Sequence, residues 1–484
     1  MHTQIQNGYR YSSNIPATVE NTGRRPRSLF AFAVVIFAVL FLQGCEKQES
    51  WTPPFEPMVC GMDEYTWINP RDMGTPIYIE LDLILSLHRG GIESMLNNTE
   101  YAGALDIKYG ADIYWVRYET QDRGVKLEAT TVLGVPHLEE GGSDSLDAPL
   151  VLWLHGTTGF MDDCAPSVER LEGAAPALLL ASQGYLVTAP DYIGMNGFGE
   201  PSEMFHPYLV GEPTAIASWD SVRAAEKTLE AESSSVSLDG RVIIWGASQG
   251  GHGAFFSELY APYYAPEYEV AATVALIAPT NLIRQTESAL MTFSSSTQLT
   301  AAALVQMARW HGMGERLDEF LTNHHPTYIA EQLVHLMDST CDIRLDEYEI
   351  QEVTDIFKED FVDGVLENDW HGYEEWKCLM GENSVAYTSV PRISDTPFLF
   401  VLSENDRLVD TPMEREEFSR LCDMGYRMEY IECAQASHSN GAIWSLPEQL
   451  EWVKLRLSST ELSRPCILEE PLCCSGSPET VCTP

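Results

Sequence analysis

The sequence predicts an α/β fold, in which helices cover both faces of a mostly parallel central sheet. Short segments that are apolar throughout alternate with longer segments of helical periodicity, a pattern typical of parallel strands buried on both faces. Turn compositions containing Gly and charged residues separate the strand-like runs. The chain has 484 residues, of which 44% are hydrophobic, so it can build a sizeable core despite a formal net charge of −43.

The expected elements follow one another along the chain. Two strand-like runs, at 113–118 and 125–135, flank a turn composition at 121–124. The next expected strands are 149–154, 185–189, 241–245 and 270–277, and the expected helices between them are 171–183, 214–232 and 249–264. After a break, the pattern resumes with strands at 398–402 and 428–431 and helices at 413–422 and 446–457. This order supports one α/β domain that is interrupted once.

The interruption covers residues 281–393, where no convincing strand pattern is found. Helical periodicity appears at 302–310 and 350–366. In the second stretch one apolar stripe recurs at three- and four-residue steps, through Ile350, Val353, Phe357, Phe361 and Val365. We therefore expect 281–393 to be a helical cap inserted into the α/β domain.

The chain is accordingly divided into six expected regions. They are an export signal at 1–44, a tether at 45–75, the two parts of the α/β core at 76–280 and 394–459, the helical cap at 281–393, and a Cys-rich tail at 460–484.

The first region has the charge and length of an export signal. Three arginines at 24–27 precede an apolar run at 29–42, which is about 21 Å long as a helix. That is short against roughly 30 Å of hydrocarbon and typical of a signal peptide. The sequence Leu42-Gln43-Gly44-Cys45 resembles a bacterial lipoprotein box. The resemblance implies that Cys45 carries a lipid anchor in a membrane, with an ordinary secretory signal as the alternative.

Charge and cysteines exclude several classes of protein. With 72 acidic against 29 basic residues, a nucleic-acid partner is not expected, because phosphate binding needs clustered Lys and Arg. No zinc-finger spacing occurs among the 11 cysteines, so we expect no metal. The serine chemistry described below calls for no cofactor either. If Cys45 carries lipid, ten cysteines remain for disulfides in an oxidising compartment. Cys341–Cys378 and Cys422–Cys433 are plausible local disulfides, but the sequence leaves the connectivity open. The last four cysteines are expected to form disulfides that hold the tail in place.

The strongest chemical signal is the motif Gly246-Ala247-Ser248-Gln249-Gly250, between an expected strand and an expected helix. This context is that of a nucleophile elbow, whose sharp turn requires glycines where strand and helix come together. Ser248 is therefore the expected nucleophile. The alternative is a serine that only caps the helix.

A serine nucleophile needs a histidine base and an orienting acid, in the chain order Ser, acid, His. Asp406 is the expected acid, because it lies four residues after the expected strand 398–402; Glu404 and Asp410 are its competitors. His438 is the expected base, and it follows the next expected strand. For the oxyanion, we expect the backbone N–H groups of Gln249 and of Thr157.

The motifs together resemble the secreted lipases of the α/β-hydrolase superfamily, which include bacterial members. The matching pieces are HGTTG (155–159), DCAPS (163–167), APDY (189–192), HPYLVGE (206–212), GASQGGH (246–252) and the segments of Asp406 and His438. The resemblance implies an α/β-hydrolase fold with a helical cap, and hydrolysis of carboxylic esters, with acylglycerols the expected substrates. The chain departs from many members at 403–405, where it has no Gly, and in its Cys-rich tail.

Three other functions stay open. A serine peptidase or amidase and an acyltransferase use the same fold and the same nucleophile. A non-catalytic surface binding protein would be expected to have lost Ser248, Asp406 or His438, yet all three are present. The sequence leaves acyl-chain preference and oligomeric state undetermined.

Overall fold

The computed structural model describes residues 50–58, 60–97, 105–139, 145–322, 329–343, 350–478 and 480–481. The expected export signal and Cys45 lie outside these residues. Within them, no helix combines the length and apolarity needed to cross a membrane.

A nine-stranded sheet forms the centre of the described chain, in the order β11-β10-β9-β8-β6-β7-β5-β4-β3. Its strands are β3 (Pro76–Leu81), β4 (Gly110–Asp122), β5 (Val125–His137), β6 (Leu146–Leu154), β7 (Leu186–Pro190), β8 (Val236–Ala247), β9 (Glu269–Leu276), β10 (Pro397–Ser403) and β11 (Arg427–Cys433). The pairs β7–β6, β6–β8, β8–β9, β9–β10 and β10–β11 are parallel. The pairs β3–β4, β4–β5 and β5–β7 are antiparallel. The predicted mostly parallel sheet is confirmed. A separate two-stranded sheet pairs β1 (Ser50–Trp51) with β2 (Trp67–Ile68).

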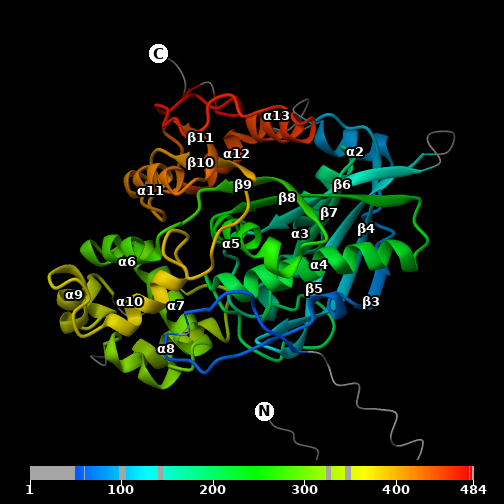
Figure 1. Cartoon of the computed structure of the whole chain (residues 1–484). Helices are drawn as coiled ribbons and strands as arrows, with labels where there is room; N and C mark the ends of the chain where they lie inside the picture. Colours follow the sequence, from blue (N-terminus) through cyan, green and yellow to red (C-terminus); the bar gives the residue numbers. More distant parts are fainter. Residues whose placement is uncertain are drawn as a thin grey trace, which may run out of the picture. The chain divides into compact units, whose positions relative to one another are not determined.

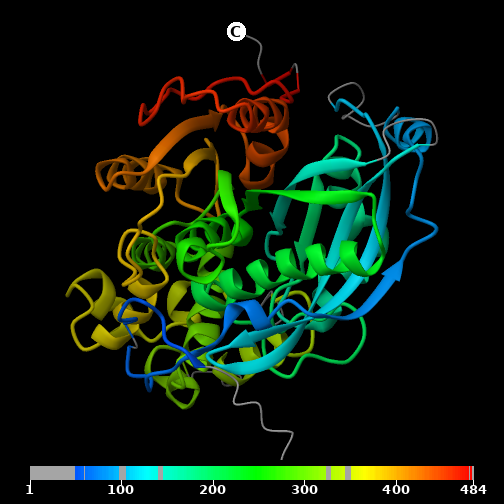
Figure 2. The ribbon, with the colours of Figure 1, turned by 45° about the vertical axis from the view of Figure 1, so that its right-hand side comes forward.

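Helices cover both faces of this sheet, because its central strands are apolar on both sides (Figures 1 and 2). Leu152 of β6 and Ile244 of β8 belong to the core beneath α4 (Gly211–Ala231), α5 (Gln249–Tyr264) and α11 (Thr411–Asp423). Their neighbours Val151 and Ile243 belong to the opposite core, beneath α3 (Arg170–Ala181) and α13 (Leu446–Leu457). The alternation of side chains along each strand thus divides the core into two layers. Two short helices, α2 (Arg89–Leu96) and α12 (His438–Trp444), complete the α/β part.

The 281–393 segment contributes helices that gather together on one side of the molecule (Figures 1 and 2). They are α6 (Leu282–Met291), α7 (Ser295–Trp310), α8 (Ile329–Met337), α9 (Glu359–Leu366) and α10 (Glu374–Glu382). They share a hydrophobic core that includes Leu304, Phe320 and Trp376 and also takes in Phe160 and Tyr208 of the α/β part.

The expectation of one helix over 350–366 is wrong. The stretch divides into a 3₁₀ turn at Val353–Asp355 and α9, with extended backbone at Lys358. Phe357 forms an isolated bridge with Leu321, and the Lys358 N–H donates to the carbonyl of Phe320, 2.9 Å away. Pairing with a distant segment therefore interrupts the helix, while Phe357 and Phe361 stay buried as the stripe predicts.

Both proposed local disulfide pairs are also wrong. The described bridges are Cys60–Cys378, Cys164–Cys341, Cys422–Cys466 and Cys433–Cys474. Two of them tie the 281–393 segment to distant parts of the chain, with sequence separations of 318 and 177 residues. The other two hold the Cys-rich tail against α11 and β11. There the Leu472 N–H donates to the carbonyl of Glu432 and the Leu472 carbonyl accepts from the Ala434 N–H, both at 2.8 Å, and this pairing protects the edge strand β11 from other chains.

Candidate active site

Ser248 lies at the sharp turn between β8 and α5. Its φ of 56° is in a region that non-glycine residues rarely adopt, so the turn is strained. A side chain on Gly246 would overlap the carbonyl oxygen of Gly250, and one on Gly250 would overlap that of Leu154. The Ser248 N–H donates to the carbonyl of Leu276, at 2.8 Å. These contacts hold the serine at the carboxyl end of the sheet.

The structure brings Ser248, His438 and Asp406 into one hydrogen-bonded array. His438 Nε2 is 2.9 Å from Ser248 Oγ, and His438 Nδ1 is 2.7 Å from Asp406 Oδ2. A carboxylate only accepts, so Nδ1 carries the proton and Nε2 accepts from the serine hydroxyl. The imidazole is thus in the tautomer that can remove a proton from Ser248.

Of the three candidate acids, only Asp406 is held toward the histidine. Its other oxygen accepts from the backbone N–H groups of Leu408 and Val409, at 2.8 and 3.1 Å. Glu404 instead accepts from the Gln435 N–H at 2.7 Å, and Asp410 caps the first turn of α11. The competitors therefore have structural partners of their own.

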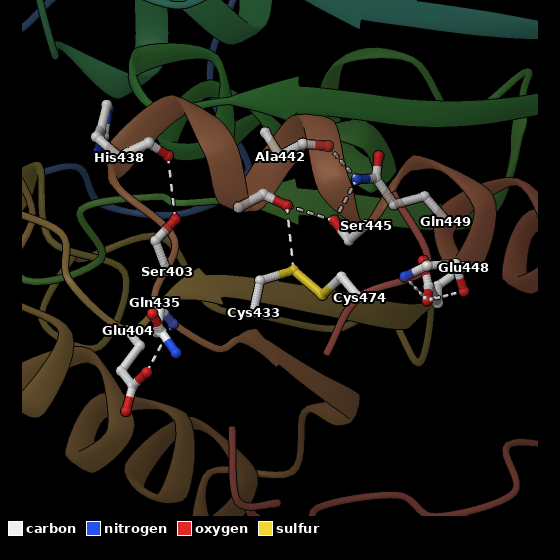
Figure 3. Close-up of a disulfide and its surroundings, with 12 residues drawn as sticks. Ser403, Glu404, Cys433, Gln435, His438, Ala442, Ser445, Glu448, Gln449 and Cys474 are labelled. Atoms are coloured by element: carbon white, nitrogen blue, oxygen red, sulfur yellow. Dashed lines mark hydrogen bonds between the residues drawn. A yellow bond between two sulfur atoms is a disulfide. The ribbon is translucent and has the colours of Figure 1, made fainter. Parts of the chain in front are cut away.

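Figure 3 shows how the chain around His438 is supported. His438 begins α12, and its carbonyl accepts from Ser403 Oγ at 3.1 Å. One turn later the Gly441 carbonyl accepts from Ser445 Oγ at 2.6 Å and lies 3.6 Å from the sulfur of Cys433. A side chain on Gly441 would collide with Ser403, so α12 can sit directly on the end of β10. The Cys433–Cys474 bridge thus lies against the helix that carries His438.

The two residues expected to supply oxyanion donors are anchored by one loop that the sequence analysis did not single out for a role. His206 Nε2 is 2.7 Å from Gln249 Nε2, while its Nδ1 is 2.9 Å from the carbonyl of Ile193. Burial lowers the pKa of His206 to about 4, so the neutral ring donates through Nδ1 and accepts from Gln249. Two residues on, the Tyr208 hydroxyl is 2.9 Å from Thr157 Oγ1. The HPY motif at 206–208 marks this loop in the sequence. It does not by itself predict the contacts with Gln249 and Thr157, which lie 43 and 51 residues from their partners.

Another histidine near this loop, His155, has a structural role. His155 Nδ1 is 2.6 Å from the carbonyl of Gly156, as expected for a histidine that bonds its own turn. Its ring stacks on Tyr192, with the centroids 4.2 Å apart. Burial lowers the pKa of His155 to about 4, which keeps it neutral at physiological pH.

Ser248, His438, Thr157 and Gln249 open into one pocket of about 750 Å³. Most of the other lining side chains are apolar, and they come from α3, α6, α7, α12 and α13. A pocket of this size with a few convergent polar groups is typical of a small-molecule site. In the part of the chain that the structure describes, no group of His, Cys, Asp or Glu side chains is arranged to hold a metal ion.

A serine on a strand–helix elbow, aligned with a histidine and a carboxylate from later strands, defines the site of an α/β-hydrolase. Solved structures agree with this fold. The rice cell wall degrading esterase LipA from Xanthomonas oryzae has a TM-score of 0.63 and 20% identity, over 80% of this chain and 99% of that one. Candida antarctica lipase A has a TM-score of 0.60 and 14% identity, over 84% and 90%.

The chain belongs to the secretory lipase family, whose model matches residues 175–464. Among curated relatives, Lipase 5 of Candida albicans is 23% identical over 325 residues, which are 63% of this chain and 64% of that lipase. Lipase 9 of the same organism is 33% identical over 116 residues, or 22% and 23% of the two chains. The matched region thus spans less than two thirds of these lipases. Cys466 and Cys474 of the tail lie beyond the family match.

We expect the Cys433–Cys474 bridge to affect turnover as well as stability. The control is Cys422–Cys466, because the two bridges close loops of similar length, with separations of 41 and 44 residues, and loop closure gives both a similar stabilisation of about 2–4 kcal/mol. Replacing either pair by alanines should lower the melting temperature. Only Cys433→Ala/Cys474→Ala should also lower kcat, by about five- to tenfold, because only that bridge supports α12. Equal kcat losses in both double variants would contradict this prediction.

Proposed function

We propose that this chain is a serine hydrolase that cleaves carboxylic esters through an acyl-enzyme, with acylglycerols or other hydrophobic acyl esters as substrates. One observation carries the proposal: the array Asp406–His438–Ser248, with links of 2.7 and 2.9 Å, opens into a mainly apolar pocket. Membership of the secretory lipase family supports it.

The first half of the reaction forms the acyl-enzyme. Ser248 Oγ attacks the ester carbonyl carbon while its proton passes to His438 Nε2. Asp406 holds the ring and stabilises the imidazolium that results. When the tetrahedral intermediate collapses, the bond from the carbonyl carbon to the alcohol oxygen breaks, and His438 gives its proton to that oxygen.

The second half releases the acid. Water attacks the acyl carbon and gives its proton to His438 Nε2, and collapse of the second intermediate returns a proton to Ser248 Oγ. In both halves the negative oxygen is met by the N–H groups of Gln249 and Thr157, each worth roughly 2.7–4 kcal/mol in comparable enzymes. The anchoring of Gln249 by His206 and of Thr157 by Tyr208 places these donors before the substrate arrives.

The disulfides and the secretory lipase family indicate an exported protein. We further propose that the mature chain begins at a diacylated Cys45 and stays on a membrane. The support is the lipoprotein-type sequence at 42–45. Several acyl chains on one residue give durable anchoring, which needs no basic protein surface.

Replacing the nucleophile is the direct test of the hydrolase proposal. Ser248→Ala should lower kcat on p-nitrophenyl butyrate by about 10⁴-fold or more, since no other group then forms the acyl-enzyme. Ser439→Ala is the matched control, because Ser439 lines the same pocket beside His438. If Ser248→Ala turns over the ester as fast as the Ser439→Ala control, the proposal fails. Turnover of the matching p-nitroanilide would favour an amidase. Transfer of the acyl group to an added alcohol in preference to water would favour an acyltransferase.

The anchor is tested separately in a bacterial host. The wild-type chain should fractionate with membranes and incorporate labelled palmitate, and Cys45→Ser should do neither. Cys60→Ser is the control, because Cys60 is a disulfide cysteine, and this variant should still incorporate the label. A Cys45→Ser chain that still carries palmitate, or a wild-type chain without it, would contradict the lipid anchor.

A further inference from the structure

The loop that carries Asp406 is bonded to α6, the first helix of the 281–393 segment. Gln285 Nε2 donates to the carbonyl of Leu408 at 2.7 Å, and Gln285 Oε1 accepts from the Asp410 N–H at 3.3 Å. A carbonyl only accepts and a backbone N–H only donates, so these two partners fix which end of the amide faces each of them. One side chain of α6 thus bridges two positions of the loop.

A single peptide unit joins Gln285 to Asp406. Its carbonyl, that of Leu408, accepts from Gln285. Its N–H, that of Val409, donates to Asp406 Oδ1 at 3.1 Å. In a trans peptide these two groups point in opposite directions, so the amide and the carboxylate lie on either side of the unit. The hydrogen bond at the carbonyl polarises the N–H and strengthens its bond to the carboxylate.

Asp406 depends on these donors because its side chain is enclosed, with only 2% of it exposed. Its Oδ2 lies 2.7 Å from His438 Nδ1. Its Oδ1 accepts from the N–H groups of Leu408 and Val409. A carboxylate that water does not reach needs such donors to stay charged. A shift of this part of the loop would therefore turn the carboxylate and change its bond to His438.

Further contacts hold α6 against the same part of the chain. Ser288, one turn after Gln285, donates through its hydroxyl to Asp410 Oδ2 at 2.7 Å. Arg284 pairs with Glu416 of α11 at 2.8 Å. Because neighbouring residues of α6 bind the loop and the helix that follows it, the amide of Gln285 is kept within reach of its two partners.

We propose that Gln285 is a positioning residue for the catalytic acid: it holds the peptide that orients Asp406, and through Asp406 it sets the ring of His438. The inference rests on the proposed ester hydrolysis. It adds that the 281–393 segment supports the catalytic array as well as lining the pocket. Gln285 itself lines the pocket, so the competing role is a direct contact with the substrate, and the test separates the two roles.

A double-mutant cycle tests whether Gln285 acts through Asp406. Gln285→Met keeps the length of the side chain and removes both hydrogen bonds. It should lower kcat by about tenfold on p-nitrophenyl acetate and p-nitrophenyl octanoate alike, and change KM by less than about twofold, because a displaced acid slows the proton transfer without altering binding. Asp406→Asn alone should lower kcat by roughly 10⁴-fold, as in comparable enzymes. In that background Gln285→Met should cost less than about twofold more.

Ser288→Ala is the matched control, because it removes a bond between the same helix and the same loop but leaves the carbonyl of Leu408 bonded. It should change kcat by less than about twofold. Gln285→Asn, whose shorter side chain cannot reach both partners, replaces Gln285→Met if that chain does not fold.

Three results would overturn the assignment: an undiminished effect of Gln285→Met in the Asp406→Asn background, an equal loss of kcat in Ser288→Ala, or a rise in KM that grows with acyl length. If the wild type hydrolyses neither ester, the proposed hydrolysis itself has failed.

Discussion

The whole site depends on the sharp turn at Ser248. β8 ends and α5 begins within one residue, which is possible only because Gly246 and Gly250 carry no side chains where the two elements meet. The turn costs a strained backbone, with φ at 56°, and the hydrogen bond to Leu276 on β9 holds it in place. Because the neighbouring parallel strands end at the same edge, the loops after β6, β10 and β11 converge on the serine, and they carry Thr157, Asp406 and His438.

The sequence predicted the α/β order, and it singled out Ser248, Asp406 and His438 as candidates, because each depends on local patterns: buried strands, an elbow motif, and positions counted from strand ends. It favoured Asp406 by its distance from the expected strand end, but the partners that separate the competitors, Gln435 for Glu404 and the first turn of α11 for Asp410, depend on tertiary contacts. The helix break at Phe357 and the disulfide pairs were missed for the same reason. Each results from contacts between segments far apart in the chain, such as the bridge from Phe357 to Leu321, and periodicity within one segment does not encode such contacts.

Disulfides and hydrogen bonds support the site from several sides. Cys60–Cys378 and Cys164–Cys341 tie the 281–393 segment to parts of the chain that precede β8, while Cys433–Cys474 lies beneath the helix of His438. The loop of His206 and Tyr208 anchors the proposed oxyanion donors, Gln249 and Thr157, without a covalent bond. An array of hydrogen-bonded catalytic groups depends on close alignment, and fixed supports of this kind preserve that alignment.

The assignment of Ser248 as the nucleophile can be tested by covalent labelling, because a fluorophosphonate reacts only with a serine whose proton is removed by a neighbouring base. We expect one equivalent of label per chain, found by mass spectrometry on the peptide that contains Ser248, and none on the His438→Ala variant. A label on another serine, or undiminished labelling of the His438→Ala variant, would contradict it.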